Sequence, residues 1–244
     1  MRLTKSALMT MLLMCLIAVT GYLKFTIQAT PVFNFSSEIE LEVEEVVEQS
    51  GKVIVIDPGH GGYDPGKVGI SGYYEKDINL QVSHKLKSCL ERSGHGVVLT
   101  REIDEDLDGI PDKFHKGADM RARKDIIVQS KPDVVVSVHQ NAFSDAKIKG
   151  AQVFYYNDKS PSKLLAQYVQ DSVRDEVDPS NTRQIKNSDS YFLLKCTNIP
   201  SIIIECGFLT NPEEERMLRS DEYQDKVANA ICKGINEFLQ NSPS

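Results

Sequence analysis

Four polar side chains of types that suit metal-assisted hydrolysis lie far apart in the sequence: His60, Glu75, His139 and Glu205. Catalytic zinc is commonly held by three protein ligands, and a fourth position stays open for water. Zinc lowers the pKa of that water to about 7, and a carboxylate that is not a ligand can then carry the proton to the leaving nitrogen. We therefore expect the first three residues to hold one zinc ion and Glu205 to be the catalytic carboxylate.

Each of these residues, taken alone, has a simpler structural explanation. A histidine at the end of a strand is usually a loop or core residue, and Glu75 would interact favourably with the positive end of a helix dipole. Glu205 is harder to explain in this way, because carboxylates are rarely buried without a partner or a function. The four residues and their local sequences together favour a catalytic site.

The elements around these residues indicate how they could meet. Short apolar runs at 53–56, 134–138 and 201–204 predict strands, and His60, His139 and Glu205 come just after them. Further strands are predicted at 97–99 and 151–156, and helices at 77–93, 120–129, 161–177 and 221–239. Strands this apolar are covered on both faces, so we expect an α/β fold with a mostly parallel sheet between helices. Sites in such sheets form beyond the carboxyl ends of strands.

The composition excludes several classes of function. Hydrophobic residues make up 41% of the 244-residue chain, which is enough for a sizeable core. The formal net charge is −7, so the basic surface typical of a nucleic-acid-binding protein is missing. Tryptophan is absent and aromatic residues are few, which argues against a stacking platform for sugars or bases.

The N-terminal region predicts export. Arg2 and Lys5 precede an apolar run at 7–23, a pattern typical of a signal peptide or an uncleaved signal anchor. We expect this segment to span 1–30, an acidic linker to span 31–51 and the catalytic domain to span 52–241. The catalytic domain would then lie outside the cytoplasmic membrane, and it would be attached to that membrane if the segment is not cleaved.

The cysteines leave the disulfide pattern open. Cys15 lies in the apolar run, and four others are scattered along the chain, at 89, 196, 206 and 232. Four cysteines allow three pairings, and free buried thiols are an equally good interpretation.

The motifs around the four polar residues resemble those of the zinc-dependent N-acetylmuramoyl-L-alanine amidases of the Amidase_3 family. They are IDPGHGG at 56–62, YEKDINL at 74–80, LTR at 99–101, Arg121, SVHQNA at 137–142 and IECGFLTN at 204–211. The resemblance covers about 53–239. It implies zinc on His60, Glu75 and His139, a catalytic Glu205, and hydrolysis of the bond between the muramic acid lactyl group and L-alanine in peptidoglycan. Substrate contacts are expected from Asn141, Arg101 and Arg121.

The layout, with an N-terminal apolar segment and no wall-binding repeat, is similar to the germination-specific branch of this family. That branch implies removal of stem peptides from spore-cortex peptidoglycan, a step toward muramic δ-lactam. It also implies a location in the forespore intermembrane space or cortex, and an accessory secreted lipoprotein as partner. One departure is that Lys124 and Asp125 follow Arg121 where family members often carry Ala-Asn.

The sequence leaves two alternative functions. Another exported zinc hydrolase, such as a polysaccharide deacetylase or a peptidase, would carry an HxxxH pair or an HExxH motif, and the sequence has neither. An inactive binding protein with an amidase fold is the second alternative, and the presence of all four key residues argues against it.

Overall fold

The computed structural model describes residues 51–109 and 115–241. The predicted signal segment at 1–30 lies outside the described residues, as does all but the last residue of the linker expected at 31–51. Among the helices that are described, none is long and apolar enough to cross a membrane.

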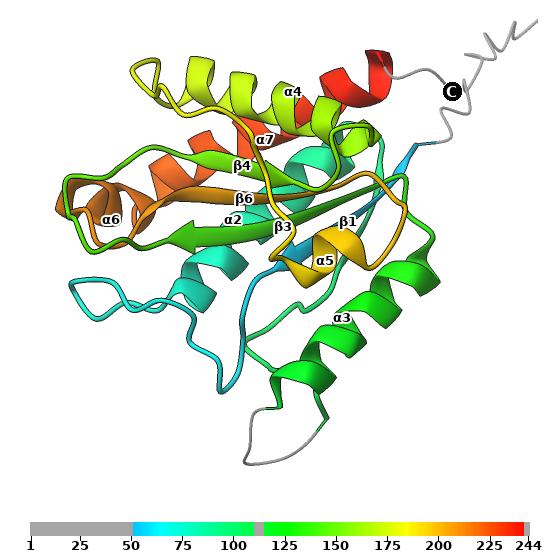
Figure 1. The fold of residues 1–244 in the computed structure, drawn as a ribbon, viewed down its shortest axis with the longest axis horizontal. Coiled ribbons are helices and arrows are strands. Elements are labelled where there is room, and N and C mark those ends of the chain that lie inside the picture. The colour runs from blue at the N-terminus through cyan, green and yellow to red at the C-terminus, as the bar shows by residue number, and fades with distance from the viewer. Residues whose placement is uncertain (1–50, 110–114, 242–244) are drawn as a thin grey trace, which may run out of the picture. The chain divides into compact units, whose positions relative to one another are not determined.

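A twisted sheet forms the centre of the described region (Figure 1). Its strand order is β2-β1-β3-β6-β4-β5. Only β4 and β6, among the paired strands of the described residues, run antiparallel; the other neighbours are parallel. The predicted mostly parallel sheet is therefore confirmed. The strands are β1 (Val53–Pro58), β2 (Gly96–Leu99), β3 (Val134–Asn141), β4 (Gln152–Tyr155), β5 (Lys186–Asn187) and β6 (Ser201–Phe208).

Helices cover both faces of this sheet (Figure 1). One layer packs α2, α4 and α7 together, and α6 lies against β6 and α7. The opposite layer is made by α3 and α5, which contact β1 and β6 respectively. The helices are α2 (Glu75–Arg92), α3 (Lys116–Ser130), α4 (Pro161–Glu176), α5 (Phe192–Lys195), α6 (Pro212–Leu218) and α7 (Asp221–Asn241).

The apolar runs form strands that are buried on both sides because successive side chains point to opposite faces. Ile54 and Ile56 of β1 join the large core under α2, α4 and α7. Val55, between them, packs with Ile127 of α3 and Leu193 of α5. This explains why the strands read as continuous apolar runs rather than as alternating patterns.

Some boundaries differ from the sequence predictions. Helix α2 begins at Glu75 and α3 at Lys116, each upstream of its predicted start. Helix α6 was not predicted, although Asn211 caps it by accepting hydrogen bonds from the backbone N–H groups of residues 213 and 214, and Pro212 opens its first turn. Helix α5 was also missed, because four residues carry no readable period.

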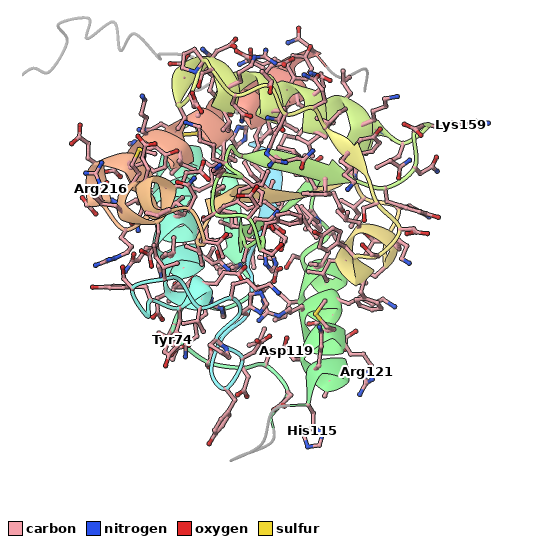
Figure 2. The ribbon with its side chains drawn as sticks, turned by 60° about the vertical axis from the view of Figure 1, so that its left-hand side comes forward. Tyr74, His115, Asp119, Arg121, Lys159 and Arg216 are labelled. Carbon is pink, nitrogen blue, oxygen red and sulfur yellow. A yellow bond between two sulfur atoms is a disulfide. The ribbon has the colours of Figure 1, made fainter. Side chains whose placement is uncertain are left out.

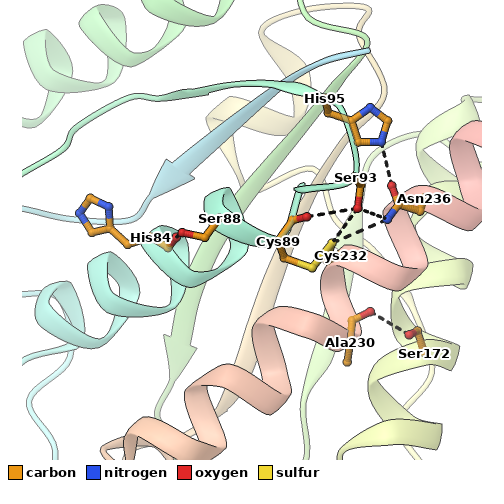
Figure 3. Close-up of a disulfide and its surroundings, with 9 residues drawn as sticks. All are labelled: His84, Ser88, Cys89, Ser93, His95, Ser172, Ala230, Cys232 and Asn236. Atoms are coloured by element: carbon orange, nitrogen blue, oxygen red, sulfur yellow. Dashed lines mark hydrogen bonds between the residues drawn. A yellow bond between two sulfur atoms is a disulfide. The ribbon is translucent and has the colours of Figure 1, made fainter. Parts of the chain in front are cut away.

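A disulfide joins Cys89 of α2 to Cys232 of α7 (Figure 3). The side chains of Ser93 and Asn236 lie beside it. Cys196 and Cys206 are free thiols. Of the pairings that the sequence left open, the structure thus contains one, and it ties together two helices of the same layer.

Candidate metal centre and active site

The four candidate residues meet at the carboxyl ends of three neighbouring strands. Strands β1, β3 and β6 lie side by side, and His139 of β3 is paired in register with Glu205 of β6. His60 follows β1 by two residues, and Glu75 opens α2. All four line one cavity of about 450 Å³.

Three of these side chains present donor atoms to a common point. Nε2 of His60 lies 3.2 Å from Oε2 of Glu75, and Nδ1 of His139 lies 2.9 Å from Oε1 of the same carboxylate. One ligand atom from each residue falls within 4.8 Å of the other two. Two ligands about 2.1 Å from a tetrahedral zinc ion are about 3.4 Å apart, so this donor set fits a single ion with little movement.

Glu75 is fixed as an anion. Its side chain is 2% exposed, and its oxygens accept hydrogen bonds from the backbone N–H groups of Lys67, at 2.8 Å, and Gln140, at 3.1 Å. Burial acts to raise the pKa of Glu75, but the two neighbouring histidines outweigh burial and hold it well below its usual range. Its position in the first turn of α2 also lets the helix dipole stabilise the negative charge of the carboxylate.

His60 is oriented by Asp64, a residue that the sequence analysis missed. Nδ1 of His60 lies 2.7 Å from Oδ2 of Asp64, and Oδ1 of Asp64 accepts a hydrogen bond from the backbone N–H of Gly66. Burial lowers the pKa of His60, but the hydrogen bonds to Asp64 and Glu75 outweigh burial and raise it to about 9. The two carboxylates, one at each ring nitrogen, therefore favour the positively charged imidazole.

Two glycines make room for this arrangement. Gly59 passes so close to the ring of His139 that an added Cβ would overlap it. Gly66 has φ of 67°, and a Cβ there would lie 2.6 Å from Oε2 of Glu75. Gly59 and Gly66 thus allow the loop backbone to approach the metal-binding side chains.

Glu205 faces the cavity from a different environment. It is 7% exposed, and its Oε1 accepts a hydrogen bond from the Tyr191 hydroxyl at 3.3 Å. Its Oε2 is buried and has no hydrogen-bond partner among the described residues. Burial raises the pKa of Glu205, and the charge of Glu75 adds to this, whereas His139 opposes it. A carboxylate with a raised pKa is suited to taking up and releasing a proton.

A family model described as N-acetylmuramoyl-L-alanine amidase matches residues 54–237. The chain belongs to this family, Amidase_3. As a member, it is an enzyme of the N-acetylmuramoyl-L-alanine amidase class. The family resemblance drawn from the sequence motifs is therefore confirmed.

Relatives of this amidase include proteins from Bacillus and Clostridioides. It is 40% identical over 193 residues to the germination-specific N-acetylmuramoyl-L-alanine amidase of Bacillus subtilis. The match covers 78% of this chain and 81% of that protein. The CwlD amidase of Clostridioides difficile, solved in complex with the GerS lipoprotein, is 42% identical with a TM-score of 0.75; the match covers 79% of this chain and 100% of that one. An N-acetylmuramoyl-L-alanine amidase from Clostridium difficile 630 is 34% identical with a TM-score of 0.71, over 79% and 99% of the two chains.

The residues expected to touch substrate lie in three different settings in this amidase. Asn141 borders the cavity, where its Oδ1 accepts a hydrogen bond from the backbone N–H of Ala142. Arg121 is exposed on α3 and points away from the body of the protein (Figure 2). Arg101 is 2% exposed and lies beneath the IDPGHGG segment at 56–62. Of the three, only Asn141 is among the residues that line the cavity, and direct substrate contact remains a prediction for each.

Arg101 supports the loop that carries His60. Its guanidinium donates to the carbonyl oxygens of Pro58, Gly59 and His60 at 2.7 to 3.1 Å. His60 has φ of 61°, in the left-handed region where residues other than glycine are uncommon. The buried arginine therefore helps to hold a backbone conformation that the loop would rarely adopt alone.

Arg123 is a second residue that the sequence analysis missed. It is buried, borders the cavity and donates to Oδ1 of Asp57 and Oδ2 of Asp119, both at 2.7 Å. Another of its nitrogens donates to the carbonyl oxygen of His60, also at 2.7 Å. Its burial depends on the contact with Asp57 in β1, which no local sequence pattern displays.

Proposed function

We propose that this amidase hydrolyses the bond between the lactyl group of N-acetylmuramic acid and the L-alanine of the stem peptide in peptidoglycan, with one zinc ion held by His60, Glu75 and His139. The observation that carries the proposal is the placement of Glu205. A buried carboxylate with an unpartnered oxygen borders the same cavity as a three-residue donor set that fits one divalent ion.

The residues have distinct roles in this reaction. When bound, zinc supplies a Lewis acid for the amide carbonyl and a water of lowered pKa. Asp64 and the backbone N–H groups around Glu75 keep the ligands in place. Glu205 takes up a proton from the attacking water and delivers it to the L-alanine nitrogen as the C–N bond breaks. The acid and the free amine of the stem peptide are the products.

Product analysis tests the reaction. Digestion of purified peptidoglycan by the zinc-loaded protein should release stem peptides whose free N-terminus is L-alanine, identified by N-terminal labelling and mass spectrometry. Release of acetate would indicate a deacetylase, and a new reducing end would indicate a glycan hydrolase. Either of these as the sole product contradicts the proposal.

Glu205 is tested by its isosteric amide. Glu205→Gln should keep one zinc per chain and lower kcat by about 100-fold or more, because the amide cannot carry the proton. Metal analysis and peptide release measure the two quantities. Turnover at the wild-type rate by the zinc-loaded variant would remove Glu205 from this role.

We place the reaction in spore-cortex maturation, outside the cytoplasmic membrane. The similarity to a germination-specific amidase supports this setting, and a disulfide is typical of proteins in oxidising compartments. Removal of the peptide frees the lactyl carboxyl group that muramic δ-lactam requires. Spores formed without this chain should therefore lack the lactam in muropeptide analysis, and normal lactam content would contradict the assignment.

An accessory secreted lipoprotein is the partner that we propose. Support comes from the 42% identical CwlD amidase, whose structure was solved in complex with the GerS lipoprotein. Purified amidase mixed with the corresponding lipoprotein of its own organism should elute as a complex in size-exclusion chromatography. Separate elution at micromolar concentrations of both proteins would argue against a stable complex.

A further inference from the structure

The two oxygens of the Glu205 carboxylate lie in unequal surroundings. Oε1 receives the hydroxyl of Tyr191, whereas Oε2 is buried and without a hydrogen-bond partner among the described residues. A buried carboxylate oxygen without a donor is costly, so such an atom points to a ligand or a proton that it meets during function. This difference between the two oxygens depends on Tyr191, because no other side-chain donor to Glu205 occurs in the described part of the chain.

Tyr191 is held firmly enough to set this geometry. It lies at the N-terminal boundary of α5, and its ring packs edge-on against Phe154 with 5.4 Å between ring centroids. Phe154 belongs to a small apolar cluster with Leu194 and Ile203, and Tyr191 packs against that cluster. The aromatic ring is thus anchored in the layer that covers β6, while the residue also borders the cavity.

The hydroxyl of Tyr191 acts as a donor. Burial raises the pKa of Tyr191 above its usual range, and the negative charge of Glu205 raises it further. The phenol therefore keeps its proton, and an ionised carboxylate can only accept. The hydrogen bond runs from Tyr191 to Oε1 in one direction only.

We propose that Tyr191 is a positioning residue for the catalytic carboxylate: its hydroxyl occupies Oε1 and fixes the rotation of Glu205, which leaves Oε2 as the oxygen that exchanges the proton. The proposal rests on the proposed function. The proton passes from the attacking water to Oε2, and then from Oε2 to the L-alanine nitrogen as the C–N bond breaks. Glu205 returns to its ionised form, and Tyr191 keeps its own proton throughout.

Tyr191→Phe separates this role from simple packing, because the ring that packs against Phe154 is retained and only the hydroxyl is lost. Without the hydroxyl the carboxylate is no longer held in its reactive orientation, so kcat should fall by about 10-fold or more. KM for a muropeptide substrate should change less than about twofold, because the substrate does not use the hydroxyl. Zinc content and melting temperature should equal those of the wild type.

Tyr156→Phe is the matched control, since Tyr156 is exposed and does not border the cavity. It should leave kcat, KM, zinc content and melting temperature unchanged. An unchanged kcat in Tyr191→Phe overturns the proposal. So does a rise in KM alone, which would indicate a substrate contact, or a fall in kcat that comes with lost zinc or a lowered melting temperature.

The wild type and Glu205→Gln are assayed beside these variants. If the wild type releases stem peptides and Glu205→Gln does not, the proposed function stands whatever Tyr191→Phe does. If the wild type releases none, the proposed function itself fails. The two failures are therefore distinguishable.

Discussion

The position of His60 depends on several residues that would not themselves bind the metal. The residue adopts φ of 61°, and the guanidinium groups of Arg101 and Arg123 both donate to its carbonyl oxygen at 2.7 Å. Asp64 orients the imidazole through its hydrogen bond with Nδ1. The backbone and the side chain of His60 are thus restrained by different partners. Together they orient Nε2 toward the metal site before a metal ion binds.

Asp64→Asn tests the restraint on the imidazole. The amide can occupy the same space, but it accepts a hydrogen bond from Nδ1–H less strongly than the carboxylate does. Loss of a carboxylate behind a metal-bound histidine typically weakens metal affinity by about 10- to 100-fold. Competition with a chromophoric chelator measures the zinc dissociation constant directly and does not depend on turnover.

Asp125→Asn is the control, because Asp125 is an exposed residue of α3. It should bind zinc as tightly as the wild type. Equal zinc affinities for the wild type and for Asp64→Asn would show that the hydrogen bond to His60 does not set the metal affinity.

At the scale of elements, the site depends on three strands that are neighbours in the sheet although they are distant in sequence. The apolar runs predict β1, β3 and β6, and the rule that parallel sheets bind at their carboxyl ends predicts that His60, His139 and Glu205 converge. Sequence patterns could supply this much because buried parallel strands leave a strong apolar signal.

Other parts of the site could not be read in this way. Tyr191 stands before a helix of four residues, too short for a periodic pattern, and its partner Glu205 is on another element. The burial of Arg123 rather than Arg121 depends on Asp57 in β1, a contact that no local pattern displays. The antiparallel direction of β4 is likewise a property of tertiary packing.

The disulfide between α2 and α7 allows a test at this scale. Cys89 lies 14 residues after Glu75 along α2, about 21 Å at 1.5 Å per residue, so the bond is remote from the site. Replacing both Cys89 and Cys232 with alanine should lower the free energy of unfolding by about 2–5 kcal/mol, because a long loop is no longer closed in the unfolded chain. Chemical denaturation without reductant measures this loss.

The same double variant should keep its zinc and its kcat at 25 °C, since the helices remain packed through their apolar faces. Cys196→Ala is a useful comparison, because Cys196 is a free thiol and no loop is opened. If non-reduced wild-type protein is alkylated at Cys89 and Cys232, the bond does not form in solution and the expected difference disappears.

At the scale of the whole molecule, the buried carboxylate of Asp57 connects several elements beneath the site. It accepts hydrogen bonds from Thr100 after β2, from Ser137 of β3 at 2.6 Å and from Arg123 of α3. Burial acts to raise the pKa of Asp57, but Arg123 and the two hydroxyls outweigh burial and lower it from 3.8 to about 2. The folded state therefore stabilises the ionised carboxylate more than the unfolded chain does.

This shift gives the fold a defined sensitivity to acid. A group whose folded pKa is lowered stabilises the protein above its unfolded pKa and loses that contribution as pH falls toward the folded value. For Asp57 the window runs from about pH 4 down to about 2, and the contribution that is lost is about 2 kcal/mol.

Urea unfolding at a series of pH values should show wild-type stability falling more steeply across this window than that of Asp57→Asn. The variant should also be less stable at pH 7, because among the described residues Arg123 then keeps only Asp119 as an ionic partner. Parallel pH profiles for the two proteins would mean that Asp57 is not the group that links the fold to protons, and the acid sensitivity would then belong to other carboxylates such as Glu75.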